Sequence, residues 1–150
     1  MNDTAHALKY MHSVASIVEL VQNYRAAMND REDHEAFENA ERAIHEGPLE
    51  IKMRSDWQTP GDRPLSGDGE FFILLSTGGP ATRIFGELEN YGPIKAVFQA
   101  CDWFEQWRNV DLYEYEQMPN EDKPEALHDL SAEDIQDHLK EYANHFYWGD

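Results

Sequence analysis

Two sets of side chains combine histidine with carboxylates at helical spacing. In each set the residues lie at positions i, i+4, i+7 and i+11, which aligns them along one side of a helix. Imidazole and carboxylate groups on facing helices can bind a transition metal. Each set also adjoins an apolar helix face, where solvated polar side chains are expected in any case. The two sets are His34, Glu38, Glu41 and His45, and Asp134, His138, Glu141 and His145.

Neither of two further reactive features indicates catalysis. Cys101 is the only cysteine, which excludes an internal disulfide and a cysteine-based zinc site, and no histidine is placed beside it by sequence. The stretch STGGP at residues 76–80 resembles an anion cradle, but no Lys-Ser/Thr pair follows it. We therefore predict a hairpin turn there and assign no catalytic residue, metal ligand or cofactor.

An aromatic and acidic run at residues 102–116 is the stronger functional candidate. Its rings can cover the open face or edge of a sheet, or they can anchor a protein partner. The neighbouring carboxylates suit a basic partner, because they steer its approach and fix its register. The candidate partner-binding residues are Trp103, Trp107, Asp111, Tyr113, Glu114, Tyr115 and Glu116.

The charge of the chain limits the classes of partner. Its 30 acidic and 12 basic residues give a formal net charge of −18. Residues 111–150 contribute 12 of the acids and 2 of the bases. Nucleic acid and anionic membranes are therefore poor direct partners. Carboxylates spaced along a surface can instead imitate DNA phosphates, which lie about 7 Å apart along a strand.

Composition and hydrophobic periodicity predict one α+β domain over residues 1–150. Apolar spacing predicts two N-terminal helices, at residues 4–28 and 31–46, and a C-terminal helix that starts at Ser131 and packs on the sheet. No apolar run reaches the roughly 20 residues that span a bilayer, and the N-terminus lacks a signal-peptide pattern. We expect a cytoplasmic protein.

Between these helices the sequence predicts an antiparallel meander of four to five strands. Residues 49–53 alternate as a half-buried strand, and residues 71–75 and 81–88 form a hairpin. A turn at residues 89–93 leads to a strand at residues 94–101, and the aromatic stretch from Asp102 through Tyr115 is a candidate fifth, irregular edge strand. The connections are too short for helical crossovers, which makes the pairing antiparallel.

Four motifs resemble a group of short, uncharacterised proteins encoded by bacteriophages, plasmids and other bacterial mobile elements. The motifs are a Gly-Pro-Leu helix end at residues 47–49, the TGGPA-R-I-GEL hairpin at 77–88, the aromatic DW segment at 102–107 and YA..FY.G at 142–149. The chain departs from this pattern after Asp102 and in an acidic insertion near residues 118–129. The resemblance implies a small accessory protein of a mobile element, a class in which blocking host defence is a common task.

These observations favour a non-catalytic, acidic protein-binding module over an enzyme. The expected partner is a basic host protein, such as a nucleic-acid-binding defence protein, that is inhibited by a DNA-like acidic surface. Two alternatives stay open: a metal-dependent enzyme that uses the histidine and carboxylate sets, and an acidic accessory protein with no specific partner. The oligomeric state is not determined by the sequence.

Overall fold

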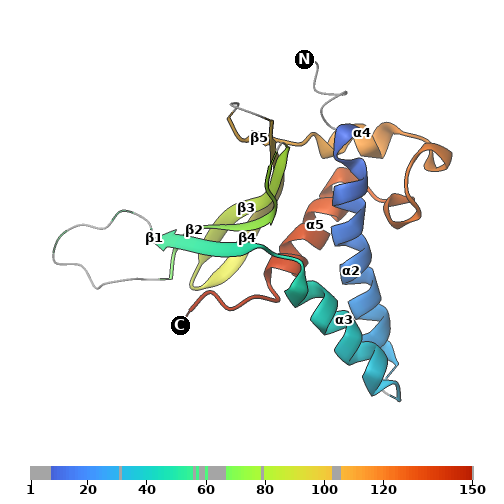
Figure 1. Ribbon diagram of the computed structural model, residues 1–150, viewed down its shortest axis with the longest axis horizontal. Coiled ribbons are helices and arrows are strands. Elements are labelled where there is room, and N and C mark those ends of the chain that lie inside the picture. The colour runs from blue at the N-terminus through green and yellow to red at the C-terminus, as the bar shows by residue number, and fades with distance from the viewer. Residues whose placement is uncertain are drawn as a thin grey trace.

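The predicted α+β class is confirmed by the computed structural model (Figure 1), which describes residues 8–30, 32–55, 57, 60, 67–78, 80–102 and 106–149. These residues form four helices and a five-stranded antiparallel sheet with the strand order β1-β2-β3-β4-β5. The helices are α2 (Met11–Asn29), α3 (His34–Glu46), α4 (Leu112–Gln117) and α5 (Ala132–Ala143). The strands are β1 (Glu50–Ser55), β2 (Gly69–Ser76), β3 (Ala81–Glu89), β4 (Gly92–Cys101) and β5 (Arg108–Asn109).

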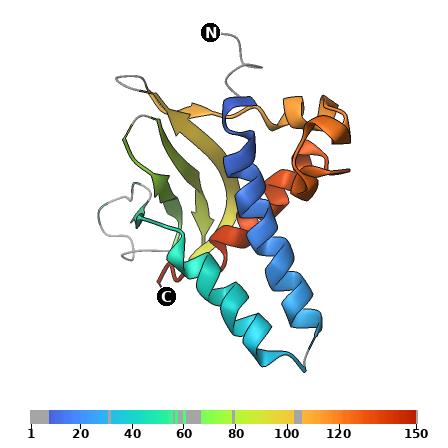
Figure 2. The same cartoon turned by 45° about the vertical axis from the view of Figure 1, so that its right-hand side comes forward.

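The helices lie on one face of the sheet. Helix α5 packs on β4, and α2 packs on both α3 and α5. Figures 1 and 2 show these helices beside one face, while no described helix lies over the other. We call residues 8–48 and 111–149, without the undescribed position 31, the helical layer, since they contain α2, α3, α4 and α5. We call the uncovered side of the sheet the open face.

The core forms where the inner face of the sheet meets this layer. Alternate residues of β2, β3 and β4 point inward, and α2 and α5 supply the opposing apolar side chains. The Trp148 ring lies 4.7 Å from the Phe71 ring, and its indole nitrogen donates to the Ala143 carbonyl. Fully buried members include Phe71, Ile73, Ile84, Phe98, Ile135, Leu139 and Tyr142.

Local signals in the sequence correctly place the central hairpin and the start of α5. Strands β2 and β3 pair around a turn in which Gly78 has φ of 91°, and Gly79 lies outside the described residues. Strands β3 and β4 are joined by Asn90 and Tyr91, both with positive φ, as a type I′ turn requires. At α5, Ser131 and Asp134 form the predicted capping box.

One local prediction is wrong, and another is confirmed only in part. The predicted half-burial of β1 is wrong: β1 is an edge strand, and all of its residues are exposed. Alternation of apolar and polar residues does not show whether another element covers the apolar side of a strand. Of the fifth edge strand predicted over residues 102–115, the structure has β5 at Arg108–Asn109. Residues 112–117 form helix α4 instead, because the Asp111 side chain accepts a hydrogen bond from the Tyr113 amide at 3.0 Å and caps a helical turn. Residues 118–130, which follow α4, contain two 3-10 turns and bury Leu127 completely.

Gly86 has a packing requirement that yields a stability prediction. It pairs with Phe71 on β2, and a Cβ at Gly86 would lie 2.7 Å from the Phe71 ring and would also collide with the Lys95 carbonyl. We expect Gly86→Ala to lower the free energy of unfolding by about 1–3 kcal/mol, measured by urea denaturation.

Gly92→Ala is the matched control for this substitution. Its added Cβ would meet its nearest neighbour, the Glu89 carbonyl, at 3.6 Å, which is an ordinary contact. The control should change the free energy of unfolding by about 0.5 kcal/mol or less. Equal effects of the two substitutions would contradict the packing described for Gly86.

Candidate functional site

The structure divides the predicted aromatic and acidic run between different parts of the molecule. Trp103 lies outside the described residues. The Trp107 ring is half-buried and stacks 4.2 Å from the Arg83 guanidinium carbon on the open face. Tyr113 is 60% exposed on α4, whereas Tyr115 on the same helix is completely buried. The run is therefore not a single surface.

Tyr115 is a core residue and cannot contact a partner. Burial, with a smaller contribution from the nearby Asp111 charge, raises the pKa of its hydroxyl well above the ordinary value. The buried Lys123 side chain donates to the Tyr115 carbonyl at 3.1 Å and ties the following turn to α4. The prediction that Tyr115 contacts a partner is wrong. Sequence alternation does not distinguish a ring that faces a partner from one that faces the core.

The start of the run is bound to the first helix. The Asp102 carboxylate accepts hydrogen bonds from the Lys9 ammonium group at 2.9 Å and the Tyr10 hydroxyl at 3.0 Å. The Asp102 hydrogen bond raises the pKa of Lys9, whereas burial is the main cause of the raised pKa of Tyr10. These bonds fix the end of β4 against the N-terminal end of α2.

The acids of the run have two different roles. Asp111 caps α4, so its carboxylate holds the helix in place. Glu114 and Glu116 are partly exposed on α4, which contacts α5. With the exposed Tyr113, they remain candidates for contact with a partner.

Charge is segregated between the two layers. The strands carry four acidic and five basic residues, so the sheet has almost no net charge. The helical layer, taken as residues 8–48 and 111–149 without the undescribed position 31, carries nineteen acidic and five basic residues. The negative charge of the described part of the protein is therefore concentrated on its helical side.

Helix α5 arranges three of these acids in a row, which we call the acidic stripe. Glu133, Asp137 and Glu141 follow at intervals of four residues, so neighbouring side chains start about 6 Å apart along the helix. Glu133 and Asp137 are exposed, while Glu141 pairs with Arg25 of α2. Glu133 and Asp137 were not among the predicted partner-binding residues, although their four-residue spacing is visible in the sequence.

Most acids of the helical layer have no cationic partner. Within the described part of the chain, the Arg25–Glu141 contact is the only ion pair that involves an acid of α3, α4 or α5. The Asp134 carboxylate is engaged differently: its capping bond with the Ser131 amide holds its pKa below the ordinary value. The uncompensated carboxylates create a negative field on this side.

The two histidine and carboxylate sets do not converge on a metal site. Among the described residues, no group of three or more His, Cys, Asp or Glu side chains is placed to hold a metal ion. The His138 ring lies 2.7 Å from the Asp134 carbonyl through Nδ1 and 3.3 Å from Arg25 through Nε2. Because a carbonyl only accepts and a guanidinium only donates, both ring nitrogens of His138 are engaged within the protein.

The remaining histidines near α5 pack against rings. His145 makes an edge contact with Tyr24 at 4.3 Å, and His45 makes one with Phe146 at 5.2 Å. These two ring contacts join α2 and α3 to the residues that follow α5.

Comparisons with protein-family models, curated proteins and solved structures give no match to this chain. None of the described helices is long and apolar enough to cross a bilayer.

His145 provides a pH-dependent test of this packing. Burial lowers its pKa below the ordinary 6.5, and the nearby Glu141, His45 and Glu41 charges adjust that shift in opposing directions. Since the unfolded chain takes up the proton at a higher pH than the folded protein, the contribution of His145 is complete above about pH 6.5 and is lost as the pH falls through the folded pKa.

We expect the melting temperature of the protein to decrease between pH 7.5 and 5.5, and His145→Gln to reduce that decrease. His12→Gln changes an exposed histidine and should leave the pH dependence as in the unmodified protein. Thermal denaturation followed by circular dichroism measures both. An unchanged slope in His145→Gln would show that burial of His145 does not contribute.

Proposed function

We propose that this protein is a non-catalytic binding module that covers a basic surface of a partner protein with its helical layer. The observation that supports this proposal is the segregation of charge, with nineteen acids and five bases on the helical layer and nearly balanced charge on the sheet. A field of one sign on one side accelerates the approach of an oppositely charged partner and orients it.

The acidic stripe supports a nucleic-acid-binding protein as the partner. Its spacing of about 6 Å along α5 is close to the roughly 7 Å between phosphates of a DNA strand. A surface built to contact phosphates with Lys and Arg would meet carboxylates at a similar interval. Such a partner would lose access to its DNA or RNA while it is bound.

The neighbouring helix α4 adds an aromatic anchor to the proposed surface. Tyr113 is 60% exposed, and Glu114 and Glu116 flank it on the same helix. Rings of this kind contribute a large part of the binding free energy at protein interfaces. We therefore assign the interface to Tyr113, Glu114, Glu116 and the acidic stripe.

The resemblance to proteins of mobile elements suggests the biological setting. In that setting the proposed partner is a host defence protein, and the proposed function is its inhibition. The rival explanation is that the charge serves solubility alone and that no specific partner exists. The two explanations differ in whether the position of the charges matters.

A pair of charge-matched variants tests this difference. The variant Glu133→Gln/Asp137→Asn removes two charges from the acidic stripe, and Glu87→Gln/Glu89→Gln removes two exposed charges from β3. Immobilised protein captures partners from a bacterial lysate, and quantitative mass spectrometry compares the variants. We expect the stripe variant to reduce capture of the specific partner about 10-fold and the β3 variant about 2-fold or less.

A salt titration and a DNA competition accompany this experiment. Capture should weaken as salt rises from 50 to 300 mM, and added double-stranded DNA should compete for the partner. Equal losses in the two variants would mean that only net charge matters, which would contradict a specific interface. Failure of DNA to compete would contradict the assignment of the partner to nucleic-acid-binding proteins.

A further inference from the structure

The open face of the sheet differs in composition from the rest of the molecule. Cross-strand pairing places Lys52, Phe72, Phe85 and Val97 in one row across β1 to β4. The neighbouring row, two residues away along each strand, contains Glu50, Leu74, Arg83, Gln99 and Asn109. Two adjacent aromatic rings thus lie in the middle of this face, with cations on both sides of them.

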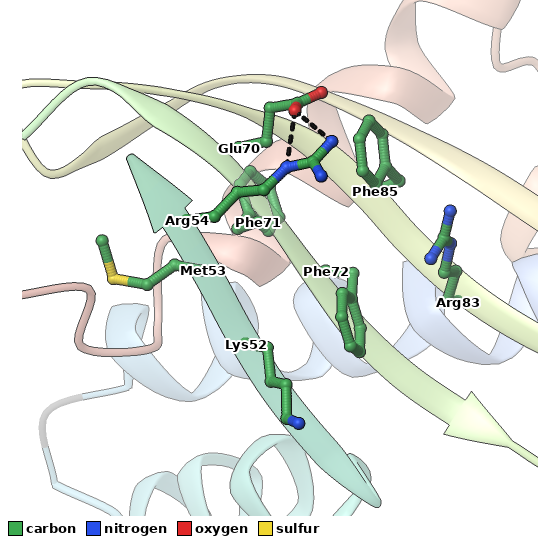
Figure 3. A pocket seen from close by; sticks show the side chains of 8 residues that line it. All are labelled: Lys52, Met53, Arg54, Glu70, Phe71, Phe72, Arg83 and Phe85. Atoms are coloured by element: carbon green, nitrogen blue, oxygen red, sulfur yellow. Dashed lines mark hydrogen bonds and ion pairs between the residues drawn. The ribbon is translucent and has the colours of Figure 1, made fainter. Parts of the chain in front are cut away.

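A groove of about 380 Å³ opens on this face (Figure 3). Its lining contains three cations, from Lys52, Arg54 and Arg83, and one carboxylate, from Glu70. Arg54 neutralises Glu70 through Nε at 2.9 Å and Nη2 at 2.6 Å. After this pairing, two cations remain in the groove of a protein whose net charge is −18.

Arg83 is the central cation. Its Nε donates to the Gln99 side chain at 2.8 Å, which fixes the plane of the guanidinium group. Its guanidinium carbon lies 4.9 Å from the Phe85 ring centre, 5.5 Å from that of Phe72 and 4.2 Å from that of Trp107. Among the described residues, Arg83 forms no ion pair with a carboxylate.

Lys52 is available in the same groove. Its ion pair with Glu50 measures 3.1 Å, and the two side chains are 64% and 44% exposed. Exposed pairs of this kind contribute little free energy, so an anion in the groove can draw the Lys52 ammonium group to itself.

We propose that this groove binds a small anion that carries a planar aromatic ring, of which a nucleoside monophosphate is the simplest example. The phosphate would bind Arg83 and Lys52, because a guanidinium fork pairs with phosphate oxygens through two hydrogen bonds. The base would stack on Phe72 and Phe85, an arrangement that stabilises nucleotides on protein surfaces regardless of base identity.

The surrounding charges favour one nucleotide over a nucleic acid strand. The groove has the volume of a small-molecule site. Glu50 and Glu87 lie on the same face just outside the groove, and the helical layer is strongly acidic. A single anion feels mainly the cations within a Debye length of about 8 Å, whereas a long polyanion would also meet these carboxylates.

This site is independent of the proposed protein interface. It lies on the open face, whereas the acidic stripe belongs to the helical layer. Failure of either proposal therefore leaves the other intact.

Titration of the full chain with AMP at 50 mM salt tests the proposal, with Trp fluorescence and calorimetry as readouts. We expect saturable binding of AMP, and binding of adenosine and inorganic phosphate that is each at least about 10-fold weaker, because each lacks half of the recognised groups. A ten-nucleotide single strand should bind no more tightly than AMP. Absence of saturable AMP binding up to about 10 mM, or tighter binding of the strand, would overturn the proposal.

Substitutions assign the binding to the groove. Arg83→Gln should weaken AMP binding about 10-fold or more, and Phe85→Leu about 3-fold or more, while Lys95→Gln removes a cation from the same face outside the groove and should change it less than 2-fold. Circular dichroism melting curves confirm that each variant is folded, and Arg83→Lys, which keeps the charge without the planar fork, should show an intermediate loss. Equal affinity in the Arg83 and Lys95 variants would overturn the assignment.

Discussion

The structure depends on the burial of one face of an antiparallel sheet under helices. The fully buried side chains of β2, β3 and β4 meet those of α2 and α5, and this apolar contact holds the two layers together. Gly86 allows the Phe71 ring to lie across β3, and Trp148 covers that ring from the chain end. Because a sheet with one covered face leaves the other exposed, the same constraint creates the open face.

The two-layer arrangement turns an acidic composition into a polarised molecule. The helical layer, with its turns included, carries nineteen of the 30 acidic residues. The sheet carries balanced charge, and its cations surround aromatic rings near Arg83. The protein therefore has two chemically different faces, and we propose that one binds a basic macromolecule and the other a small aromatic anion.

The sequence predicts what depends on local signals. Turn residues and alternation identified the β2–β3 hairpin, and Ser131 with Asp134 identified the start of α5. It did not predict that Tyr115 is buried or that Ile51 and Met53 of β1 are exposed, because these outcomes depend on which elements cover them. The cluster around Arg83 was also missed, since it requires the pairing register of distant strands and the return of Trp107 to the sheet.

We propose that the helical layer, rather than net charge as such, is what contacts a basic partner. Carbodiimide labelling of surface carboxylates, measured by mass spectrometry with and without the captured partner, tests this proposal. We expect Glu133 and Asp137 to become protected in the complex, while Glu87 and Glu89 on β3 label as in the free protein. Protection of the β3 carboxylates with continued labelling of the acidic stripe would contradict the proposal.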